Sequence, residues 1–158
     1  MSPVADATGE RCGNGQGGPV WFLAGTYGSS PAHRVCHVPA GKYLFFPIIN
    51  YVVMPCSGCG GLTCPEAEAT AREMTDGPTA LFFELDGRSF ADLNGHRVAS
   101  AQCFNVAARA PGGRNLSPSA SDGYWLALPP LPKGEHRLHF GGSLPSLRQE
   151  LYYTLIVE

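Results

Sequence analysis

The longest apolar run of the chain is Tyr43-Leu44-Phe45-Phe46-Pro47-Ile48-Ile49. Its length is that of a β-strand and falls well short of the ~18 residues that a membrane-spanning helix requires. Apolar side chains occupy both its odd and its even positions, so both faces of such a strand would be buried. We therefore predict that this run is a central strand of the core, and we expect no membrane span.

Other strands are predicted on either side of this run, each bounded by glycine, proline or polar turn residues. Two hairpins are expected, one of them closed by Asp86-Gly87, a dipeptide that favours tight turns. The predicted strands are Val20–Ala24, Arg34–Val38, Leu81–Leu85 with Arg88–Leu93, Arg97–Val106, Tyr124–Leu128 with His136–Phe140, and Gln149–Val157.

A single short helix is predicted over Pro65–Thr75, because a proline stands at its first position and Glu66 lies in its first turn. Asp76-Gly77-Pro78 would end it. Many short strands with turns about every ten residues are typical of an all-β fold. We predict a β-sandwich of jelly-roll type with this one helix.

Composition agrees with a single domain rich in turns. The chain has 158 residues, of which 44% are hydrophobic and only 15% charged, with 20 glycines and 14 prolines. We expect a flexible N-terminal segment over residues 1–11 and one disulfide-stabilised domain over residues 12–158. The net charge is −2 and the basic residues are scattered singly, so nucleic acid is excluded as a partner.

Six cysteines are present, namely Cys12, Cys36, Cys56, Cys59, Cys64 and Cys103. Chains of this size with so many cysteines generally use them as disulfides in an oxidising compartment. We predict Cys12 paired with Cys36, because they flank the first strand and its return, and Cys103 paired with a cysteine of the 56–64 loop. Two alternatives stay open, free thiols and a metal site of Cys56, Cys59, Cys64 and Cys103, although their spacing does not form the two close pairs of a structural zinc site. We expect no metal and no cofactor.

The chain begins Met1-Ser2-Pro3-Val4-Ala5-Asp6, without the basic and apolar regions of a signal peptide. A cytosolic protein is one interpretation. The cysteine content favours the other, a secreted or periplasmic protein represented here by its mature chain with a starting methionine.

Three stretches resemble an uncharacterised family of mostly secreted bacterial and archaeal proteins. They are residues 15–25 (GQGGPVWFLAG), residues 36–50 (CHVPAGKYLFFPIIN), and residues 121–128 (SDGYWLAL) running on to 134–142 (GEHRLHFGG). The resemblance covers most of the chain from about residue 10. It implies secretion and carries no specific activity.

A ligand site is predicted around Asp122, Tyr124 and Trp125, which follow the long polar loop Ala107–Ser121. Aromatic rings beside a carboxylate suit a neutral glycan or a surface ligand, with the loop as an adaptable rim. Asn50, at the end of the central run, is a further candidate. The alternative is a turn aspartate followed by core aromatics. We predict an extracellular binding or assembly module that recognises a glycan or another cell-surface ligand and can self-associate through its strand edges.

A small secreted enzyme is the alternative function, either a hydrolase or a metal-dependent oxidase that gathers His and Asp from separate strands. His37 or His136 could take part with a distant carboxylate. No nucleophile motif of the G-x-S-x-G type and no phosphate-binding loop occurs in the sequence. An enzyme should have a pocket with at least two titratable groups of perturbed pKa, whereas a binding module should have a shallow aromatic surface.

Overall fold

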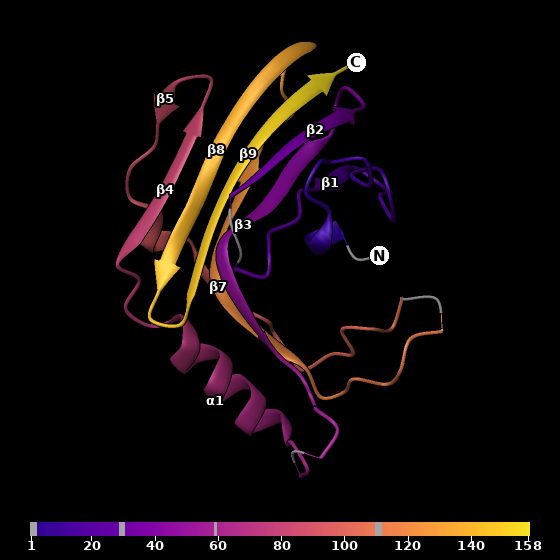
Figure 1. The fold of residues 1–158 in the computed structure, drawn as a ribbon, viewed down its shortest axis with the longest axis vertical. Coiled ribbons are helices and arrows are strands. Elements are labelled where there is room, and N and C mark those ends of the chain that lie inside the picture. Colours follow the sequence, from indigo (N-terminus) through magenta and orange to yellow (C-terminus); the bar gives the residue numbers. More distant parts are fainter. Residues whose placement is uncertain (1–2, 29–30, 59, 110–111) are drawn as a thin grey trace.

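The structure is a computed structural model that describes residues 3–28, 31–58, 60–109 and 112–158. Two sheets pack face to face, with one α-helix below them (Figure 1). Sheet A has the order β1 (Val20–Phe22), β3 (Tyr43–Val53), β7 (Ala120–Leu128) and β6 (Arg97–Ala99). Sheet B has the order β2 (Ala32–Val38), β9 (Leu147–Val157), β8 (Gly134–Leu144), β4 (Ala80–Leu85) and β5 (Arg88–Ser89). The helix α1 spans Cys64–Thr75, and short 3-10 turns occupy Pro3–Ala5 (η1) and Leu93–His96 (η2).

The β-sandwich and the single α-helix among the described residues agree with the sequence prediction, but jelly-roll topology is not confirmed. Both sheets are mixed, because β1 pairs with β3 and β2 pairs with β9 in parallel. The predicted second hairpin is wrong, since β7 lies in sheet A and β8 in sheet B. The connection between them contains Pro129, Pro130 and Pro132, which favour an extended crossing over a tight turn. β8 instead forms its hairpin with β9.

The central strand β3 contains a β-bulge between Pro47 and Ile49. Pro47 has no N–H to donate to the ladder, and prolines inside sheets are confined to edges and bulges. Before the bulge Pro47 lies opposite Trp125, and after it Ile49 lies opposite Tyr124 and Asn50 opposite Gly123. Because strand faces alternate with period two, the extra residue exchanges the faces on which the following side chains lie.

Gln149 of β9 satisfies the backbone groups that the bulge leaves open. It is 2% exposed, and its Nε2 donates to the carbonyls of Pro47 at 3.0 Å and Ile48 at 2.8 Å. Its Oε1 accepts from the N–H of Thr26 at 2.9 Å. One side chain of sheet B thus fixes the bulge of sheet A and the loop after β1.

The core lies between the sheets and is built on aromatic contacts. Phe46 of β3 lies 4.6 Å from Phe140 and 5.5 Å from Phe83, measured between ring centroids. On the same face of sheet A, beyond the end of sheet B, α1 packs Ala67 and Ala71 against Ala120 of β7. These small side chains let the helix lie close to the sheet.

The disulfides agree with the predicted pairings. Cys12 is bonded to Cys36, and Cys64 is bonded to Cys103, which ties the start of α1 to the segment after β6. Cys56 is also disulfide-bonded, while Cys59 lies outside the described residues. No cysteine is free in the described part of the chain.

The described part of the N-terminal segment, residues 3–11, makes specific contacts with the sandwich. The Asp6 carboxylate is buried and accepts backbone N–H groups of Thr8, Gly9 and Arg11 at 2.8–3.0 Å. Burial alone would raise the pKa of Asp6, but these hydrogen bonds outweigh it and lower the pKa. The Thr8 carbonyl accepts from Val35 at 2.9 Å, so the segment lies along β2.

Arg34 of β2 joins this segment to the rest of the domain. Its buried guanidinium makes five hydrogen bonds, which is its full donor capacity. The acceptors are the carbonyls of Val4, Asp6, Ala24 and Gly25 and the hydroxyl of Tyr153.

Across the described ranges, no helix has the length and apolarity needed to cross a membrane.

We expect Gln149→Ala to destabilise the fold by about 3 kcal/mol, because two buried carbonyls and one partly buried N–H would be left without partners. Urea unfolding followed by fluorescence measures this loss. Gln102→Ala, at an exposed position, is the matched control and should change stability by less than about 0.5 kcal/mol. Equal effects of the two substitutions would contradict the role of Gln149.

Candidate ligand-binding groove

A groove of about 690 Å³ lies on the face of sheet A that points away from sheet B. Its floor comes from β3 and β7. Figure 1 shows the flanking segments on the same side of these strands, with the β1 region above and the segment after β6 below. The lining includes Phe22, Phe45, Pro47, Asn50, Trp125 and, at the edges, Tyr27, Met54, Val106 and Leu147.

Three aromatic rings cross the floor from strand to strand. Phe22 of β1 and Phe45 of β3 meet edge to face with 6.0 Å between centroids. Phe45 and Trp125 of β7 are stacked at 5.3 Å with an interplanar angle of 7°. Such cross-strand contacts stabilise the sheet and also fix the rings in one arrangement.

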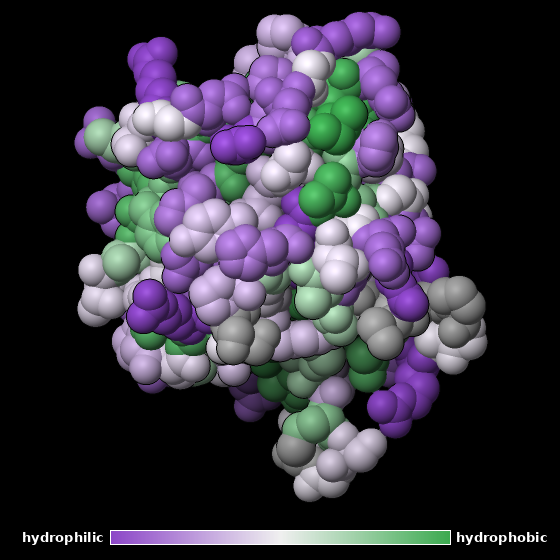
Figure 2. Space-filling view, turned by 45° about the horizontal axis from the view of Figure 1, so that its top comes forward, coloured by the Kyte–Doolittle hydropathy of each residue, from purple (hydrophilic) through white to green (hydrophobic). Residues whose placement is uncertain are grey.

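Exposed hydrophobic side chains gather at this groove. Eight large hydrophobic side chains are exposed in the described structure, and four of them line it: Phe22 at 54%, Tyr27 at 71%, Met54 at 42% and Val106 at 42%. Elsewhere the exposed hydrophobic surface is more dispersed, and Figure 2 shows several separate green patches among polar residues on the face it presents. A clustered apolar patch of this kind marks a binding surface more often than scattered exposure does.

The groove is uncharged but has polar groups to orient a ligand. None of its described lining residues is Asp, Glu, Lys, Arg or His. The amide of Asn50 and the indole N–H of Trp125 make no hydrogen bond with the described residues. Gly123 makes room for Asn50, because a Cβ there would lie 2.4 Å from the Cβ of Asn50.

The four residues predicted as a ligand site therefore separate onto two faces. Trp125 and Asn50 line the groove, whereas Asp122 and Tyr124 point toward α1 and the core and are 3% and 4% exposed. The prediction placed Asp122 at the end of a loop, but β7 begins at Ala120. Inside a strand, Asp122 and Tyr124 share a face that Gly123 and Trp125 cannot share.

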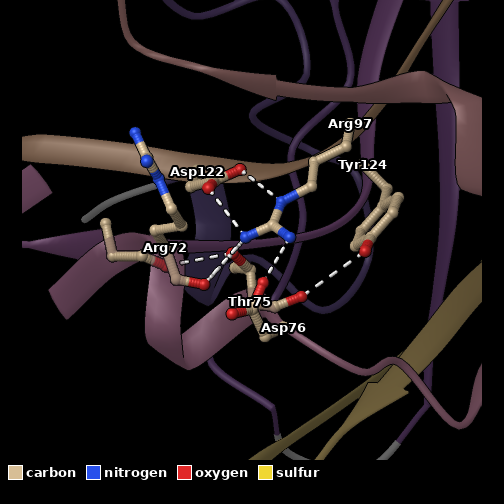
Figure 3. Close-up of polar contacts among 7 residues, drawn as sticks. Arg72, Thr75, Asp76, Arg97, Asp122 and Tyr124 are labelled. Atoms are coloured by element: carbon tan, nitrogen blue, oxygen red, sulfur yellow. Dashed lines mark hydrogen bonds and ion pairs between the residues drawn. The ribbon is translucent and has the colours of Figure 1, made fainter. Parts of the chain in front are cut away.

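Asp122 is the buried anchor of an ion-pair network (Figure 3). The Arg97 guanidinium donates to both its carboxylate oxygens, at 3.1 and 2.9 Å. Arg97 also pairs with Asp76 and donates to the backbone carbonyl of Arg72 at 2.8 Å. The hydrogen bond to Asp122, followed by that to Asp76, raises the pKa of Arg97 against the opposing effect of burial. The network joins β6 and β7 to the end of α1.

Thr75 and Tyr124 complete this junction. Thr75 Oγ1 lies 3.0 Å from the Arg97 guanidinium, and the Tyr124 hydroxyl donates to the carbonyl of Thr75 at 3.5 Å (Figure 3). Asp122 and Tyr124 thus hold the helix on the sheet. The sequence does not reveal this role, because Arg97 is distant in the chain and the strand boundary was misplaced.

The long loop lies beside the groove but contributes little to it in the described part. Val106, just before the predicted loop Ala107–Ser121, is a lining residue. Asn105 orders the loop, because its Oδ1 accepts the N–H groups of Ala107 and Leu116, both at 3.0 Å. Residues 110–111 of this loop lie outside the described residues. The predicted rim function of the loop stays a prediction.

The cluster of Cys64, Glu68 and Cys103 does not provide cysteine ligands for a metal while its disulfide is formed. The ligand atoms of Cys64, Glu68 and Cys103 lie within 4.8 Å of one another. The two sulfurs are bonded to each other, so neither is a thiolate that could bind a metal.

The histidines of sheet B pair with carboxylates or stack on rings outside the groove. His37 Nδ1 lies 3.1 Å from Glu158 Oε1, with both side chains exposed. His139 Nε2 lies 3.0 Å from Glu150 Oε1. Tyr152 lies between His139 and His33, at centroid distances of 4.1 and 4.5 Å. His33, Tyr152 and His139 thus form a stacked row across sheet B, and their contacts are structural.

His136 has an acceptor at each ring nitrogen. Nδ1 lies 2.8 Å from Asp86 Oδ2, and Nε2 lies 2.8 Å from the Pro132 carbonyl. Burial by itself would lower the pKa of His136, but these two acceptors favour the protonated ring and raise it. The pKa of Asp86 is lowered in turn: burial opposes this, but the N–H of Arg137 and the ring of His136 outweigh it. The pair joins the β4–β5 turn, which contains Asp86, to His136 near the start of β8 and gives His136 a structural role.

Comparisons of the chain with models of protein families, with curated proteins and with solved structures found no match. The family resemblance of the three sequence stretches therefore stays a prediction.

We expect Asp122→Asn to destabilise the protein by about 3 kcal/mol, because it removes one partner of a largely buried ion pair. Asp76→Asn is the matched control on the same guanidinium. The side chain of Asp76 is 59% exposed, so its loss should cost less than about 1 kcal/mol. Chemical denaturation measures both, and a larger effect of the Asp76 change would contradict the assignment of Asp122 as the anchor.

The pair of His136 and Asp86 should contribute stability in a defined pH window. The raised pKa of His136 stabilises the fold below its ordinary value of 6.5, and this contribution is lost as pH rises through the folded pKa. The lowered pKa of Asp86 stabilises above 3.8, and this contribution is lost as pH falls through the folded pKa. The pair therefore contributes most between roughly pH 4 and 6.5.

A histidine NMR titration should place the pKa of His136 above 6.5 in the wild type and lower in Asp86→Asn. The thermal stability lost between about pH 5.5 and 8.5 should be smaller in Asp86→Asn than in the wild type, by less than about 1 kcal/mol because Asp86 is partly exposed. A His136 pKa that the Asp86 change leaves unaltered would contradict this account.

Proposed function

We propose that the protein is an extracellular binding module that recognises a neutral ligand with apolar faces, such as a glycan, in the groove on sheet A. The observation that carries this proposal is the row Phe22, Phe45 and Trp125 on the floor of a groove without charged lining residues in its described part. Pockets that combine apolar walls with a few convergent polar groups are the usual form of small-molecule sites.

Rigid rings suit a ligand that must be bound with little loss of entropy. The stacking of Phe45 on Trp125 restricts both side chains before the ligand arrives, so less ordering remains to be done on binding. The indole N–H of Trp125 and the amide of Asn50 supply donors and an acceptor for hydroxyl groups. A polyanion would find no counter-charge in this lining.

The proposed site keeps Trp125 and Asn50 from the sequence prediction and replaces Asp122 and Tyr124 with Phe45 and Phe22. The change removes the carboxylate from the ligand contacts, because Asp122 is engaged by Arg97 on the other face. This makes the expected ligand more apolar than the sequence alone suggests.

An enzyme is the less supported alternative. A catalytic pocket should hold at least two titratable groups with perturbed pKa, and the described lining of the groove has only the tyrosines Tyr27 and Tyr51 among titratable residues. The pKa values of His136 and Asp86 are shifted, but this pair lies on sheet B, between β8 and the β4–β5 turn, and lines no part of the groove.

The disulfides support the extracellular or periplasmic location included in this proposal, because such bonds persist in oxidising compartments. The jelly-roll type of the sandwich remains part of the same proposal. Self-association through strand edges is a second proposed function, with less support than ligand binding. The edge of β2 is already covered at Val35 by the carbonyl of Thr8.

The test is a glycan array of neutral oligosaccharides, followed by titration calorimetry with the strongest hit. Trp125→Ala should weaken binding by about 30-fold, which corresponds to roughly 2 kcal/mol for a central aromatic contact. Phe45→Ala should act in the same direction, and Asn50→Ala should weaken binding less.

Phe90→Ala is the matched control, because Phe90 is 39% exposed, lies beside β4 of the opposite sheet and does not line the groove. It should leave affinity unchanged. Asp122→Asn should also leave affinity unchanged at temperatures where it is folded. Absence of any binding on the array, or an affinity that Trp125→Ala does not alter, would overturn the proposal.

A further inference from the structure

The groove on sheet A follows β3 and is longer than its aromatic floor. Its lining includes Phe45 near the start of β3 and Met54 just after its end. An extended chain rises ~3.3 Å per residue, so the distance from Phe45 to Met54 is roughly 30 Å at most. In Figure 1 this length runs from beside the β1 region down to the segment after β6. The groove therefore has room for a linear ligand that extends beyond the rings.

The two halves of the groove differ in chemistry. The half beside β1 contains the three aromatic rings of the floor. Beyond Asn50 the lining includes the apolar side chains of Val52, Met54 and Val106, together with Tyr51. Asn50, Val52 and Met54 follow one another at every second position, and such side chains share one face of a strand. The lining thus changes from aromatic to mainly aliphatic at Asn50.

The aliphatic half is open to solvent. Met54 and Val106 are each 42% exposed, and Val52 is half-buried. The side chain of methionine is unbranched and flexible, so it adapts to partners of different shape. A ligand that covers these side chains would remove apolar surface from water, which favours binding. An alkyl chain has the chemistry to do this.

The polar groups that could hold a head group lie on the aromatic side of this boundary. Asn50 lies opposite Gly123 in the ladder, two residues from Trp125 on the same face of β7. Four residues of extended chain separate Asn50 from Met54, a distance of roughly 13 Å. None of the described lining residues is charged in either half. The groove therefore has a polar aromatic end and an apolar aliphatic end.

We propose that the groove binds single molecules of an uncharged amphiphile with a linear alkyl chain, of the chemistry of an alkyl glycoside. This rests on the proposed function and extends it, because the sugar head would lie against Trp125 and Asn50. The tail would lie over Val52 and Val106 and point toward Met54. A charged head would find no counter-charge in the described lining, and a sugar without a tail would leave the aliphatic half uncovered.

The test is calorimetric titration of the intact disulfide-bonded protein with alkyl β-glucosides from methyl to decyl, each below its micelle concentration. Affinity should rise by about twofold to fourfold for each added methylene until the tail passes Met54, because each buried methylene contributes apolar transfer free energy. Octyl sulfate and octyltrimethylammonium have the same tail and a charged head. Each should bind about tenfold more weakly than octyl glucoside, or less, because its charge has no partner.

Two variants of nearly unchanged size test the position of the tail. Met54→Gln and Val106→Thr should each reduce the gain in affinity per methylene and leave the binding of methyl glucoside unchanged. Val98→Thr is the matched control, because Val98 is 58% exposed and does not line the groove. It should leave the whole series unchanged. Trp125→Ala should weaken every glucoside by a similar factor and keep the gain per methylene.

An affinity that does not rise with chain length would overturn this inference. The proposed glycan site would survive that result if methyl glucoside still binds and Trp125→Ala weakens it. A rise with chain length that Trp125→Ala leaves unaltered would support the alkyl site and contradict the contact of the head with Trp125, on which the proposed function depends. Binding to neutral phosphatidylcholine vesicles without binding to any dispersed glucoside would overturn the inference in favour of a membrane-contacting face.

Discussion

The absence of an N–H on Pro47 is the constraint on which the arrangement of sheet A depends. β3 is paired on both sides, with β1 and β7, so a gap in its ladder affects the whole sheet. The bulge absorbs this gap, and Gln149 of the opposite sheet bonds the carbonyls that it frees. A regular ladder would put Asn50 opposite Asp122, whereas the bulge puts it opposite Gly123 on the face of Trp125. The position of the Asn50 amide in the groove is therefore a consequence of Pro47.

Two arginines provide the polar connections that a chain with few charges needs. Arg34 binds four carbonyls of the N-terminal segment and the loop after β1, and Arg97 binds Asp122, Asp76 and the end of α1. In each case a planar guanidinium with several donors holds together segments that are distant in the sequence. Both therefore fix the borders of the sandwich, while the aromatic core fixes its centre.

The sequence predicts local features well because they depend on neighbouring residues. Pro65 and Glu66 define the start of α1, and the positions of the cysteines around the first strands suffice for the pairing of Cys12 with Cys36. Long-range features fail. Nothing near Tyr124 indicates that its strand begins at Ala120, and sequence adjacency cannot tell that β7 and β8 belong to different sheets. For that reason two of the four predicted ligand residues, Asp122 and Tyr124, lie on the buried face of the sheet.

The alternation of β7 explains how one short strand serves both structure and recognition. Asp122 and Tyr124 face α1 and the core, where their partners Arg97 and Thr75 satisfy them. Gly123 and Trp125 face the groove, where Gly123 leaves space for Asn50 and Trp125 stacks on Phe45. A change on the first face should act on stability and a change on the second on binding, because no side chain of β7 reaches both.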